Sequence, residues 1–416
     1  MLKAFINHQL KYGPLFKKRL RKIREFHEFS EDKRLIIESE KLQQLLKLAY
    51  QKSSFYKNLY DQYGVNLSQV QNREDLKILP VITKQDIKHK VDEIYFGKPF
   101  KHTAYTSGTS GSPLKVYYSL DCVLNEASYN EVFRNNGGHQ LGQKVVSLRG
   151  VLGRSQLKSY DRFANTLFLS SYNLNEKNFQ FYYNEIKNFQ PNTILAYPSS
   201  LEILSNYLQK NGLELHVPVI FTSSETLYDF QREKIERYFN TKVYDRYGNA
   251  ERTISLIQKK HQGDYKEAPL YSINEYKKDC IITTNLISPT FPLIRCQVDD
   301  LVQLRKDSDE VSIKEITGRI DDVLLLEDGT QIGRMDLVFK GVENVLYAQI
   351  IQERIGFFTV NLVKAKNFSI KDKNNIEQNI INRIGELSQF KLNFVQEKDL
   401  IKTKKGKYKL VINRAL

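Results

Sequence analysis

Apolar residues recur at helical spacing between about residues 31 and 63, near the amino-terminal end of the chain. Leu42 and Leu46, for example, are four residues apart and lie on one face of a helix. This spacing predicts an amphipathic helical segment that buries one side. A further helix is expected to begin near Lys84, because Thr83 is suited to cap it.

Short strand-like runs alternate with helical runs through the middle of the chain. Alternation of this kind is typical of α/β proteins with largely parallel strands, because each helix returns the chain to the start of the next strand. The strand-like runs are KVVSLRG, NTILAYP, VPVIFTS and TKVYDRYG, and the helical runs are SLEILSNYLQ and YDFQREKIERYF. We therefore expect an α/β fold, with a large amino-terminal domain of layered α/β subdomains.

The pattern changes after roughly residue 265, where short strands follow one another without long helices. DCIITTNL, FPLIRCQV and DLVQLRK predict a small β-rich subdomain at about residues 265–317. Strands around VLLLED, AQIIQE and FFTVNLV then accompany a helix predicted at residues 371–387. The expected organisation is a large domain over residues 1–320 and a small α+β domain over residues 321–416.

Composition narrows the class of protein. The chain has 416 residues, of which 41% are hydrophobic, so it can bury more than one core. We find neither an apolar run long enough to cross a membrane nor the apolar core of a secretory signal, which favours a cytoplasmic protein. The three cysteines, Cys122, Cys280 and Cys296, are far apart and do not indicate a disulfide framework or a metal knuckle.

The formal net charge of +15 would attract nucleic acid, an anionic membrane surface or phosphorylated substrates. Basic residues are spread along the chain, with local density at residues 17–24 and 402–409. Nucleic-acid-binding domains usually concentrate such residues on one element. The spread favours an enzyme with phosphorylated substrates and no nucleic-acid partner. A basic module that binds nucleic acid or a membrane surface through residues 17–24 is the alternative, and peripheral membrane contact stays open.

The segment YTSGTSGSPLK, at residues 105–115, combines glycines with hydroxyl side chains. Glycine allows the backbone to approach a ligand closely and hydroxyls add hydrogen-bond donors, so the segment is suited to hold phosphate. It is not a Walker loop, because Pro113, Leu114 and Lys115 stand where that motif needs Gly-Lys-Ser/Thr. Taken alone, such a loop is more often a flexible surface turn.

This loop resembles the TSGT(T/S)GxP loop of adenylate-forming enzymes, the superfamily of acyl-CoA synthetases, luciferases and peptide-synthetase adenylation domains. Four further likenesses follow in the order of that superfamily. SSETLYDFQREKIERYF with VYDRYGNAE resembles the adenine-binding turn and the Tyr-Gly-x-x-Glu element, and PLIRCQVDDLV resembles the ribose-binding element. GRIDD resembles the hinge, and KTKKGKYK resembles the terminal Gly-Lys element.

Within the superfamily, the chain is most similar to the phenylacetate-CoA ligase-like group, and especially to its CapK-type branch, found with capsular polysaccharide genes. YQKSSFYKNLY, LKILPVITKQDI, LAYPSSLEIL and DGTQIGRMDLVFKGVENVLYAQIIQE carry this likeness. It implies an AMP-forming acid ligase that converts ATP and a carboxylic acid to an acyl adenylate and pyrophosphate. The acyl group would then pass to a thiol of coenzyme A or a carrier protein, or to an amine or hydroxyl, in surface polysaccharide biosynthesis.

The resemblance also implies roles for the matched residues. Asp300 would accept hydrogen bonds from the ribose hydroxyls, although the family usually has glycine in place of its neighbour Asp299. Ser224 and Glu225 would lie beside adenine, and Tyr247 would pack on it. The other residues implied to bind the nucleotide are Thr106, Ser107, Gly108, Thr109, Ser110, Gly111, Lys115, Gly248 and Arg319.

The implied catalytic residues are Lys407, Thr109 and Glu251. Lys407 would neutralise charge during adenylation, and Glu251, a hard carboxylate suited to a hard cation, would bind Mg²⁺. Asp321 would be the hinge about which the small domain rotates between the two half reactions. A catalytically inactive relative that only binds nucleotide is a further alternative, and the intact acidic and basic positions count against it.

Several relatives in this group carry cysteines and histidines suited to zinc after the Tyr-Gly-x-x-Glu element. The corresponding stretch here, SLIQKKHQGDYKEAP, keeps only His261, and one imidazole cannot build a tetrahedral site. No zinc is predicted, and the expected cofactors are ATP and Mg²⁺, with coenzyme A as a candidate acceptor. The acyl pocket is expected around residues 129–155 and 196–202.

Overall fold

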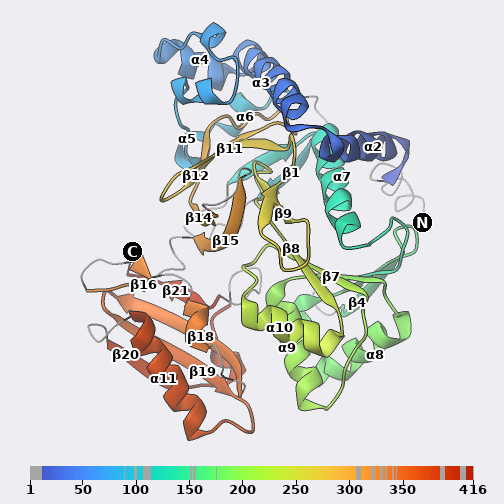
Figure 1. Ribbon diagram of the computed structural model, residues 1–416, viewed down its shortest axis with the longest axis vertical. Coiled ribbons are helices and arrows are strands. Elements are labelled where there is room, and N and C mark those ends of the chain that lie inside the picture. The colour runs from blue at the N-terminus through green and yellow to red at the C-terminus, as the bar shows by residue number, and fades with distance from the viewer. Residues whose placement is uncertain are drawn as a thin grey trace.

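Two parts of unequal size make up the molecule (Figure 1). The computed structural model describes residues 12–88, 90–97, 101–105, 114–149, 152, 156–174, 176–305, 311–319, 324–327, 331–332, 335–339, 342, 344–384, 389–402 and 409–415. The larger part runs to residue 319. The smaller part, from residue 324 onward, lies at the lower left of Figure 1.

The amino-terminal helical segment is two helices rather than one. Ser53 separates α3 (Glu31–Lys52) from α4 (Ser54–Gln62), and its Oγ accepts a hydrogen bond from the backbone N–H of Tyr56 at 3.4 Å while donating to the carbonyl of Glu93 at 2.8 Å. A serine hydroxyl competes with the helix for backbone groups, which explains the break. The other amino-terminal elements are α2 (Pro14–Glu28), η1 (Leu67–Gln69), η2 (Glu74–Ile78), α5 (Lys84–Lys88) and α6 (Val91–Ile94).

Helix α5 begins where the sequence predicts. The hydroxyl of Thr83 accepts from the backbone N–H of Asp86 at 3.4 Å, and the Asp86 carboxylate accepts from the backbone N–H of Thr83 at 2.7 Å. Such reciprocal bonds satisfy backbone donors at the start of a helix.

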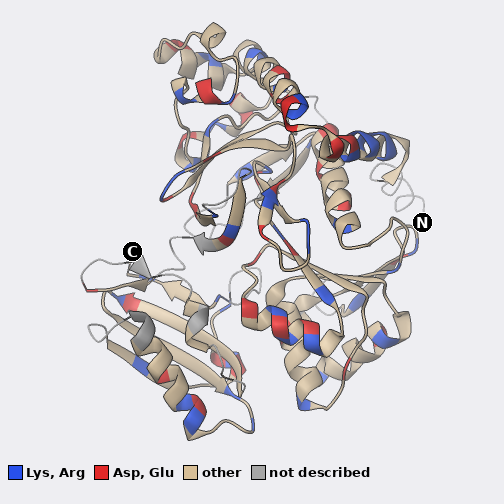
Figure 2. Cartoon of the chain, in the orientation of Figure 1, with Lys and Arg blue, Asp and Glu red and all other residues tan. Residues whose placement is uncertain are grey.

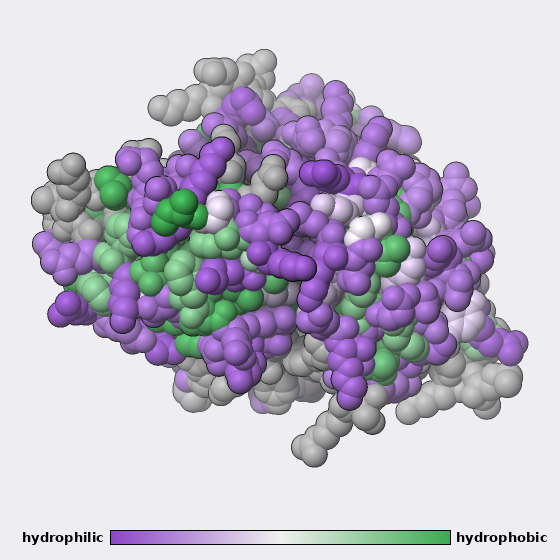
Figure 3. Space-filling model, turned by 90° about the horizontal axis from the view of Figure 1, so that it is seen from below, coloured by the Kyte–Doolittle hydropathy of each residue, from purple (hydrophilic) through white to green (hydrophobic). Residues whose placement is uncertain are grey.

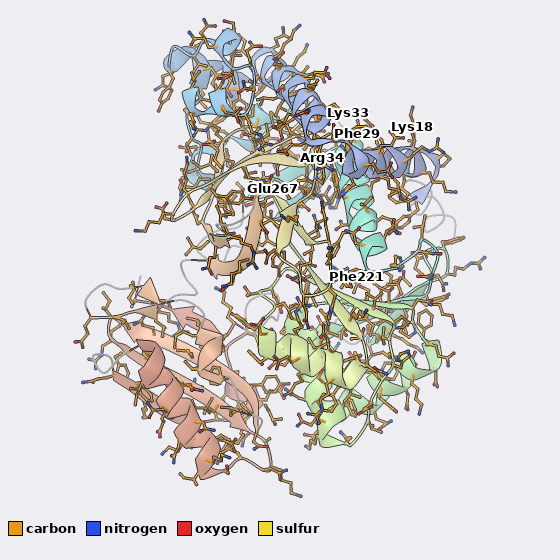
Figure 4. The ribbon with its side chains drawn as sticks, viewed as in Figure 1. Lys18, Phe29, Lys33, Arg34, Phe221 and Glu267 are labelled. Atoms are coloured by element: carbon orange, nitrogen blue, oxygen red, sulfur yellow. The ribbon has the colours of Figure 1, made fainter. Side chains whose placement is uncertain are left out.

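Arg34 holds the corner between α2 and α3 (Figure 4). It donates hydrogen bonds to the carbonyls of Phe26 at 3.0 Å and His27 at 2.8 Å.

One sheet of ten strands, in the order β14-β15-β10-β9-β8-β7-β6-β3-β5-β4, organises the larger part among the described residues. The predicted strand runs form its parallel centre. The parallel strands are β3 (Val145–Leu148), β5 (Thr166–Leu169), β6 (Thr193–Ala196), β7 (Val219–Ser223) and β8 (Lys242–Gly248). The antiparallel strands are β4 (Lys158–Asp161), β9 (Ser255–Gln258), β10 (Tyr265–Glu267), β14 (Asp300–Leu304) and β15 (Ser312–Arg319).

Helices cover both faces of the parallel centre, as continuously buried strands require. Ile194 and Ile220 belong to one buried cluster with Leu204 of α9 (Pro198–Lys210), while Phe221 on the other face packs with Phe133 of α7 (Leu120–Asn136). The remaining helices of this part are α8 (Phe179–Phe189), α10 (Asp229–Phe239), η3 (Ser171–Asn173) and η4 (Glu176–Asn178). The predicted α/β fold class is confirmed.

The β-rich stretch after residue 265 is divided between two sheets. Its strands β10, β14 and β15 extend the large sheet, while β11 (Ser272–Tyr276), β12 (Ile281–Asn285) and β13 (Cys296–Val298) form a three-stranded sheet. A separate hairpin pairs β1 (His102–Tyr105) with β2 (Lys115–Tyr118). The periodicity of the sequence predicts that a segment is a strand. It does not predict which sheet the strand joins, because that depends on contacts with distant strands.

The smaller part is built on a four-stranded sheet in the order β20-β19-β18-β21. Ile376 and Ile380 of α11 (Ile370–Ile384) are buried in one cluster with Ile350, Phe358 and Val360 of the sheet. The elements are β16 (Leu324–Leu325), β17 (Gln331–Ile332), η6 (Met335–Phe339), β18 (Val345–Arg354), β19 (Phe357–Lys364), β20 (Gln389–Phe394), η7 (Glu397–Asp399) and β21 (Val411–Asn413).

The two parts contact each other through α9. Asn206 donates to the carbonyl of Leu346 at 2.8 Å, and the hydroxyl of Tyr207 donates to Glu397 at 3.3 Å. Tyr347 and Val363 of the smaller part also join the buried cluster of the larger part. Seen from below, the largest group of surface hydrophobic residues lies on the smaller part, at the left (Figure 3).

Basic residues are densest on α2 and otherwise spread over the molecule (Figure 2). On that helix, Phe16, Leu20 and Ile23 are buried against α7, while the lysines face outward. Within the described residues, no helix combines the length and apolar character that a membrane crossing needs.

Candidate active site

A cleft of about 1240 Å³ lies between the carboxyl ends of the parallel strands and the smaller part. Tyr197, Ser223 and Glu251 line it from the ends of β6, β7 and β8, and Asp300 lines it from the start of β14. Leu346 of β18 borders it from the smaller part. Ligands of open α/β sheets generally bind at this edge, because loops following adjacent strands converge there.

A turn after β7 brings Ser224 and Glu225 into the cleft. Ser224 has a left-handed backbone with φ of 72°, a conformation that non-glycine residues adopt mainly at functional or tightly constrained sites. The Glu225 carboxylate accepts from the backbone N–H of Ser199, at the start of α9, at 3.0 Å. The turn is therefore fixed to the neighbouring helix.

Tyr247 and Asp300 meet across the cleft wall, with the tyrosine hydroxyl donating to the carboxylate. Asp300 is buried and lines the cleft, whereas Asp299 is exposed and accepts from the side chain of Gln297 at 2.9 Å. Asp299 lies in the connection after β13, whereas Asp300 is the first residue of β14. Of the two aspartates, only Asp300 is placed to contact a ligand in the cleft.

Glu251 is buried and paired with Lys84, whose Nζ lies 3.6 Å from the carboxylate. The loop that carries Glu251 is held by contacts with Tyr118. The Arg252 guanidinium lies 3.6 Å from the centre of the Tyr118 ring, and the Tyr118 hydroxyl donates to the carbonyl of Ala250. Burial together with this support fixes the carboxylate in the cleft.

Lys115 does not line the cleft. It forms an ion pair of 3.6 Å with Asp92, and the Tyr117 hydroxyl donates to the same carboxylate at 2.7 Å. Asp92 is 72% exposed, and such surface pairs contribute little to stability. The pairing therefore leaves Lys115 available to other anions, but its predicted contact with phosphate is not among the described contacts.

His261 is bonded to Glu236, with 2.6 Å between Nε2 and the carboxylate. In the described part of the chain, no cluster of three or more histidine, cysteine, aspartate or glutamate side chains is suited to hold a metal ion. Magnesium needs fewer protein ligands, because it commonly takes one or two carboxylates together with phosphate oxygens and water. A single buried Glu251 is compatible with that requirement.

Sequence comparisons point to one family. A family model described as the CapK C-terminal domain matches residues 324–414. Protein CapK of Staphylococcus aureus is 26% identical over 99% of this chain and 95% of its own length. Indoleacetate–lysine synthetase of Pseudomonas savastanoi is 25% identical over 60% of this chain and 62% of its own length. Phenylacetate-coenzyme A ligase of Escherichia coli (strain K12) is 24% identical over 71% and 74%.

The fold agrees with these relatives. The crystal structure of 2-hydroxyisobutyryl-CoA ligase in the postadenylation state, in complex with R3-HIB-AMP, is similar with a TM-score of 0.73 and 15% sequence identity. The match covers 92% of this chain and 90% of that chain. The chain is thus similar to protein CapK along nearly its whole length, and it shares the fold of adenylate-forming ligases. The named relatives include a synthetase and coenzyme A ligases, and together they support an AMP-forming acid ligase.

The structure brings several of the predicted residues to one cleft and leaves others undescribed. Ser224, Glu225, Tyr247, Gly248, Glu251 and Asp300 all line the cleft. The predicted residues outside the described ones are Thr106, Ser107, Gly108, Thr109, Ser110, Gly111, Asp321 and Lys407. The backbone of Arg319 pairs with Asp300 between β14 and β15, but its side chain is not described.

Two cations of the site carry no signal in the sequence. Lys84 follows a helix cap in a segment otherwise rich in lysine, and its contact with Glu251 joins residues far apart in the chain. Arg149 follows β3 and lines the cleft beside Ser223. Only the folded chain identifies either residue.

Proposed function

We propose that this CapK-type protein uses ATP to convert a carboxylic acid to its acyl adenylate, releases pyrophosphate, and transfers the acyl group to a nucleophilic acceptor. The observation that supports this most directly is the shared cleft. The Ser224–Glu225 turn, the Tyr247–Asp300 pair and the Glu251–Lys84 pair lie around it. ATP needs a site for its base, hydrogen-bond acceptors for its ribose and positive charge for its phosphates. The turn would contact the base, Asp300 would accept from the ribose, and Lys84 with a metal on Glu251 would face the phosphates.

Asp300 would bind the ribose. A carboxylate has two oxygens and no proton to place, so it can accept hydrogen bonds from both ribose hydroxyls. The bond from Tyr247 fixes the carboxylate and keeps the ring against the nucleotide position. Ser224 and Glu225 would contact adenine, and the rigid left-handed turn holds them ready.

Charge must be neutralised where the acid attacks the α-phosphorus, because the nucleophile and the phosphates are both anionic. Glu251 would hold Mg²⁺, which supplies positive charge beside the phosphate oxygens when bound. Lys84 would then contact the phosphates, since the metal takes the carboxylate with which it is paired here. The loop at residues 106–111, together with Lys115, would hold the departing pyrophosphate, and Lys407 would approach the acid and the α-phosphate.

The acceptor is either a thiol or an amine or hydroxyl. A phenylacetate-coenzyme A ligase name implies transfer to a thiol, and an indoleacetate–lysine synthetase name implies transfer to an amine. Both kinds of relative are about equally similar to this chain. We therefore keep coenzyme A, a carrier protein, and an amine or hydroxyl of a sugar as candidate acceptors, in the synthesis of a surface polysaccharide.

A pyrophosphate exchange screen over carboxylic acids tests the first half reaction. The expected result is acid-dependent exchange of labelled pyrophosphate into ATP, lowered at least about 100-fold in Lys407→Ala, because a positioned cation contributes that much to such steps. Lys409→Ala is a matched control two residues away. Absence of exchange with every acid, in protein whose melting temperature rises on addition of ATP, would contradict the proposal.

A further inference from the structure

Three arginines lie together at the end of the cleft that is formed by α7, β3 and β8. Arg134 of α7, Arg149 after β3 and Arg246 of β8 all line the cleft. The guanidinium groups of Arg134 and Arg246 are close enough to lower the pKa of Arg149, although burial is the larger cause. Three positive charges in one wall need negative partners.

Two of these arginines have their own carboxylates. Arg246 is paired with Glu126 at 2.9 Å, and Arg134 is paired with Glu131 at 3.3 Å. Both glutamates belong to α7, and Glu131 is buried while Glu126 is half-buried, so each pair is part of the internal structure of the protein.

Arg149 has no such partner among the described residues. Its guanidinium donates a hydrogen bond of 3.2 Å to the hydroxyl of Ser223, and no carboxylate of a described residue is recorded within ion-pair distance of it. Burial lowers the pKa of Arg149 to about 10, so the side chain is still charged at neutral pH. Arg149 is half-buried, and a partly desolvated charge without a described counter-ion is stabilised by a ligand that supplies one.

The position of Arg149 separates it from the nucleotide contacts. β6 and β7 lie between β3 and β8 in the sheet, and Glu251 follows β8. Arg149 contacts Ser223, which precedes the Ser224–Glu225 turn, and makes no described contact with Glu251 or Asp300. An anion bound by Arg149 is therefore distinct from the phosphates held on the other side of the cleft.

We infer that Arg149 binds a second anionic group on the acid substrate, a carboxylate or phosphate other than the carboxylate that is activated. The inference rests on the proposed function, since it names the class of acid that the same site accepts. A planar guanidinium matches either anion through two parallel hydrogen bonds. Ser223 adds a hydroxyl beside the same position.

The test compares acids that differ in one charge. Pyrophosphate exchange is measured with short α,ω-dicarboxylic acids and with monocarboxylic acids of the same chain length. The wild type should favour the dicarboxylic member of at least one pair by about tenfold or more in kcat/KM, the effect of one well-placed charged hydrogen bond. Arg149→Leu should reverse this preference, and Arg149→Lys should keep part of it. Arg237→Leu, which removes an exposed arginine of the same cleft, is the matched control.

Each outcome decides the inference. A wild type that exchanges with monocarboxylic acids and rejects every dicarboxylic partner overturns it and leaves the proposed function standing. Equal loss of both acid classes in Arg149→Leu, with ATP still raising its melting temperature, also overturns it, because Arg149 then serves the activated carboxylate. If no acid supports exchange, the proposed function fails, and the inference is tested by the binding of dicarboxylates alone. It stands if dicarboxylates raise the melting temperature of the wild type but not that of Arg149→Leu, and it is overturned if they do not.

Discussion

Asp299 and Asp300 show how one residue position decides a chemical role. The two side chains are identical, yet one is exposed and bonded to Gln297 while the other is buried against Tyr247. Their places in the fold produce the difference, because Asp299 lies in the connection after β13 and Asp300 begins β14. A ribose in the cleft can therefore meet only the second carboxylate.

Substitution of the two aspartates should separate them. Asp300→Asn is expected to raise the KM for ATP roughly tenfold or more, because an amide accepts through one oxygen and loses the charge that strengthens both bonds. Asp299→Asn should leave that KM nearly unchanged. Pyrophosphate exchange as a function of ATP concentration gives both values. A larger effect of Asp299→Asn would contradict the assignment.

At the residue scale, the sequence predicted what the motifs mark and missed what the fold assembles. Glu251 and Asp300 could be predicted from the sequence because each stands in a recognisable local pattern, and both line the cleft. Lys84 and Arg149 have no such pattern, since the groups that define their roles come from other elements. A lone lysine or arginine has the same local signal on any solvated surface.

At the scale of elements, the carboxyl-terminal end of α7 packs closely against the large sheet. Gly137 follows the helix, and a β-carbon added there would lie 2.7 Å from the ring of Phe221. That ring packs against Phe133 and Tyr244 (Figure 4). The glycine is required by close packing, because its backbone φ of −89° is open to other residues.

Gly137→Ala should lower the free energy of unfolding by about 1–3 kcal/mol, the usual cost of overpacking a buried contact. Urea denaturation followed by circular dichroism measures the change. In the background of Phe221→Leu, which removes the ring, the same substitution should cost clearly less. An equal cost in both backgrounds would show that the contact with Phe221 is not the cause.

Element prediction succeeded where the signal is local. Thr83 predicted the start of α5, and β-branched runs predicted β3, β6, β7 and β8. The sequence did not predict the helix break at Ser53, because the helical periodicity continues across it and its hydrogen bond to Glu93 comes from a distant segment. The joining of β10, β14 and β15 to the large sheet escaped for the same reason.

On the scale of the whole molecule, the observed orientation of the two parts is supported by α9 through Asn206 and Tyr207. The described contacts between the two parts also include the apolar packing of Tyr347 and Val363. Interfaces between domains of one chain are commonly rearranged, and a two-step reaction in one site would need the smaller part to change its orientation.

Asp321→Pro tests whether residue 321 is the hinge of that change. Proline fixes φ and should prevent rotation while leaving one orientation accessible. We expect pyrophosphate exchange to stay within about threefold of the wild type, while transfer to the acceptor falls at least about 100-fold. Asp322→Pro is a neighbouring control. Equal loss of both half reactions in Asp321→Pro would contradict the assignment.

A buried histidine should make the stability of the whole molecule depend on pH. His139 is 3% exposed, its ring bonds to Thr193 at 2.9 Å, and Glu131 lies 3.9 Å away. Burial, with help from Arg134, lowers the pKa of His139 to about 4 from 6.5. The folded protein therefore keeps the ring neutral at a pH where the unfolded chain takes up a proton.

The resulting stability is complete above pH 6.5 and is lost as the pH falls toward 4, by on the order of 3 kcal/mol. Burial raises the pKa of Glu131, which acts in the opposite direction and reduces the net loss. Denaturant unfolding at intervals between these pH values should show the decline, and His139→Gln should make it shallower. An unchanged slope in the variant would assign the decline to other groups.

The pairing of Asp300 with Arg319 places two events on one rung of the sheet. The chain leaves the large part immediately after that rung and enters the smaller part at Leu324. Under the proposed function, the residue that would bind the ribose therefore pairs directly with the last described residue of the larger part. Nucleotides that lack a ribose hydroxyl are then expected to change the rate of the second half reaction as well as the affinity for the nucleotide.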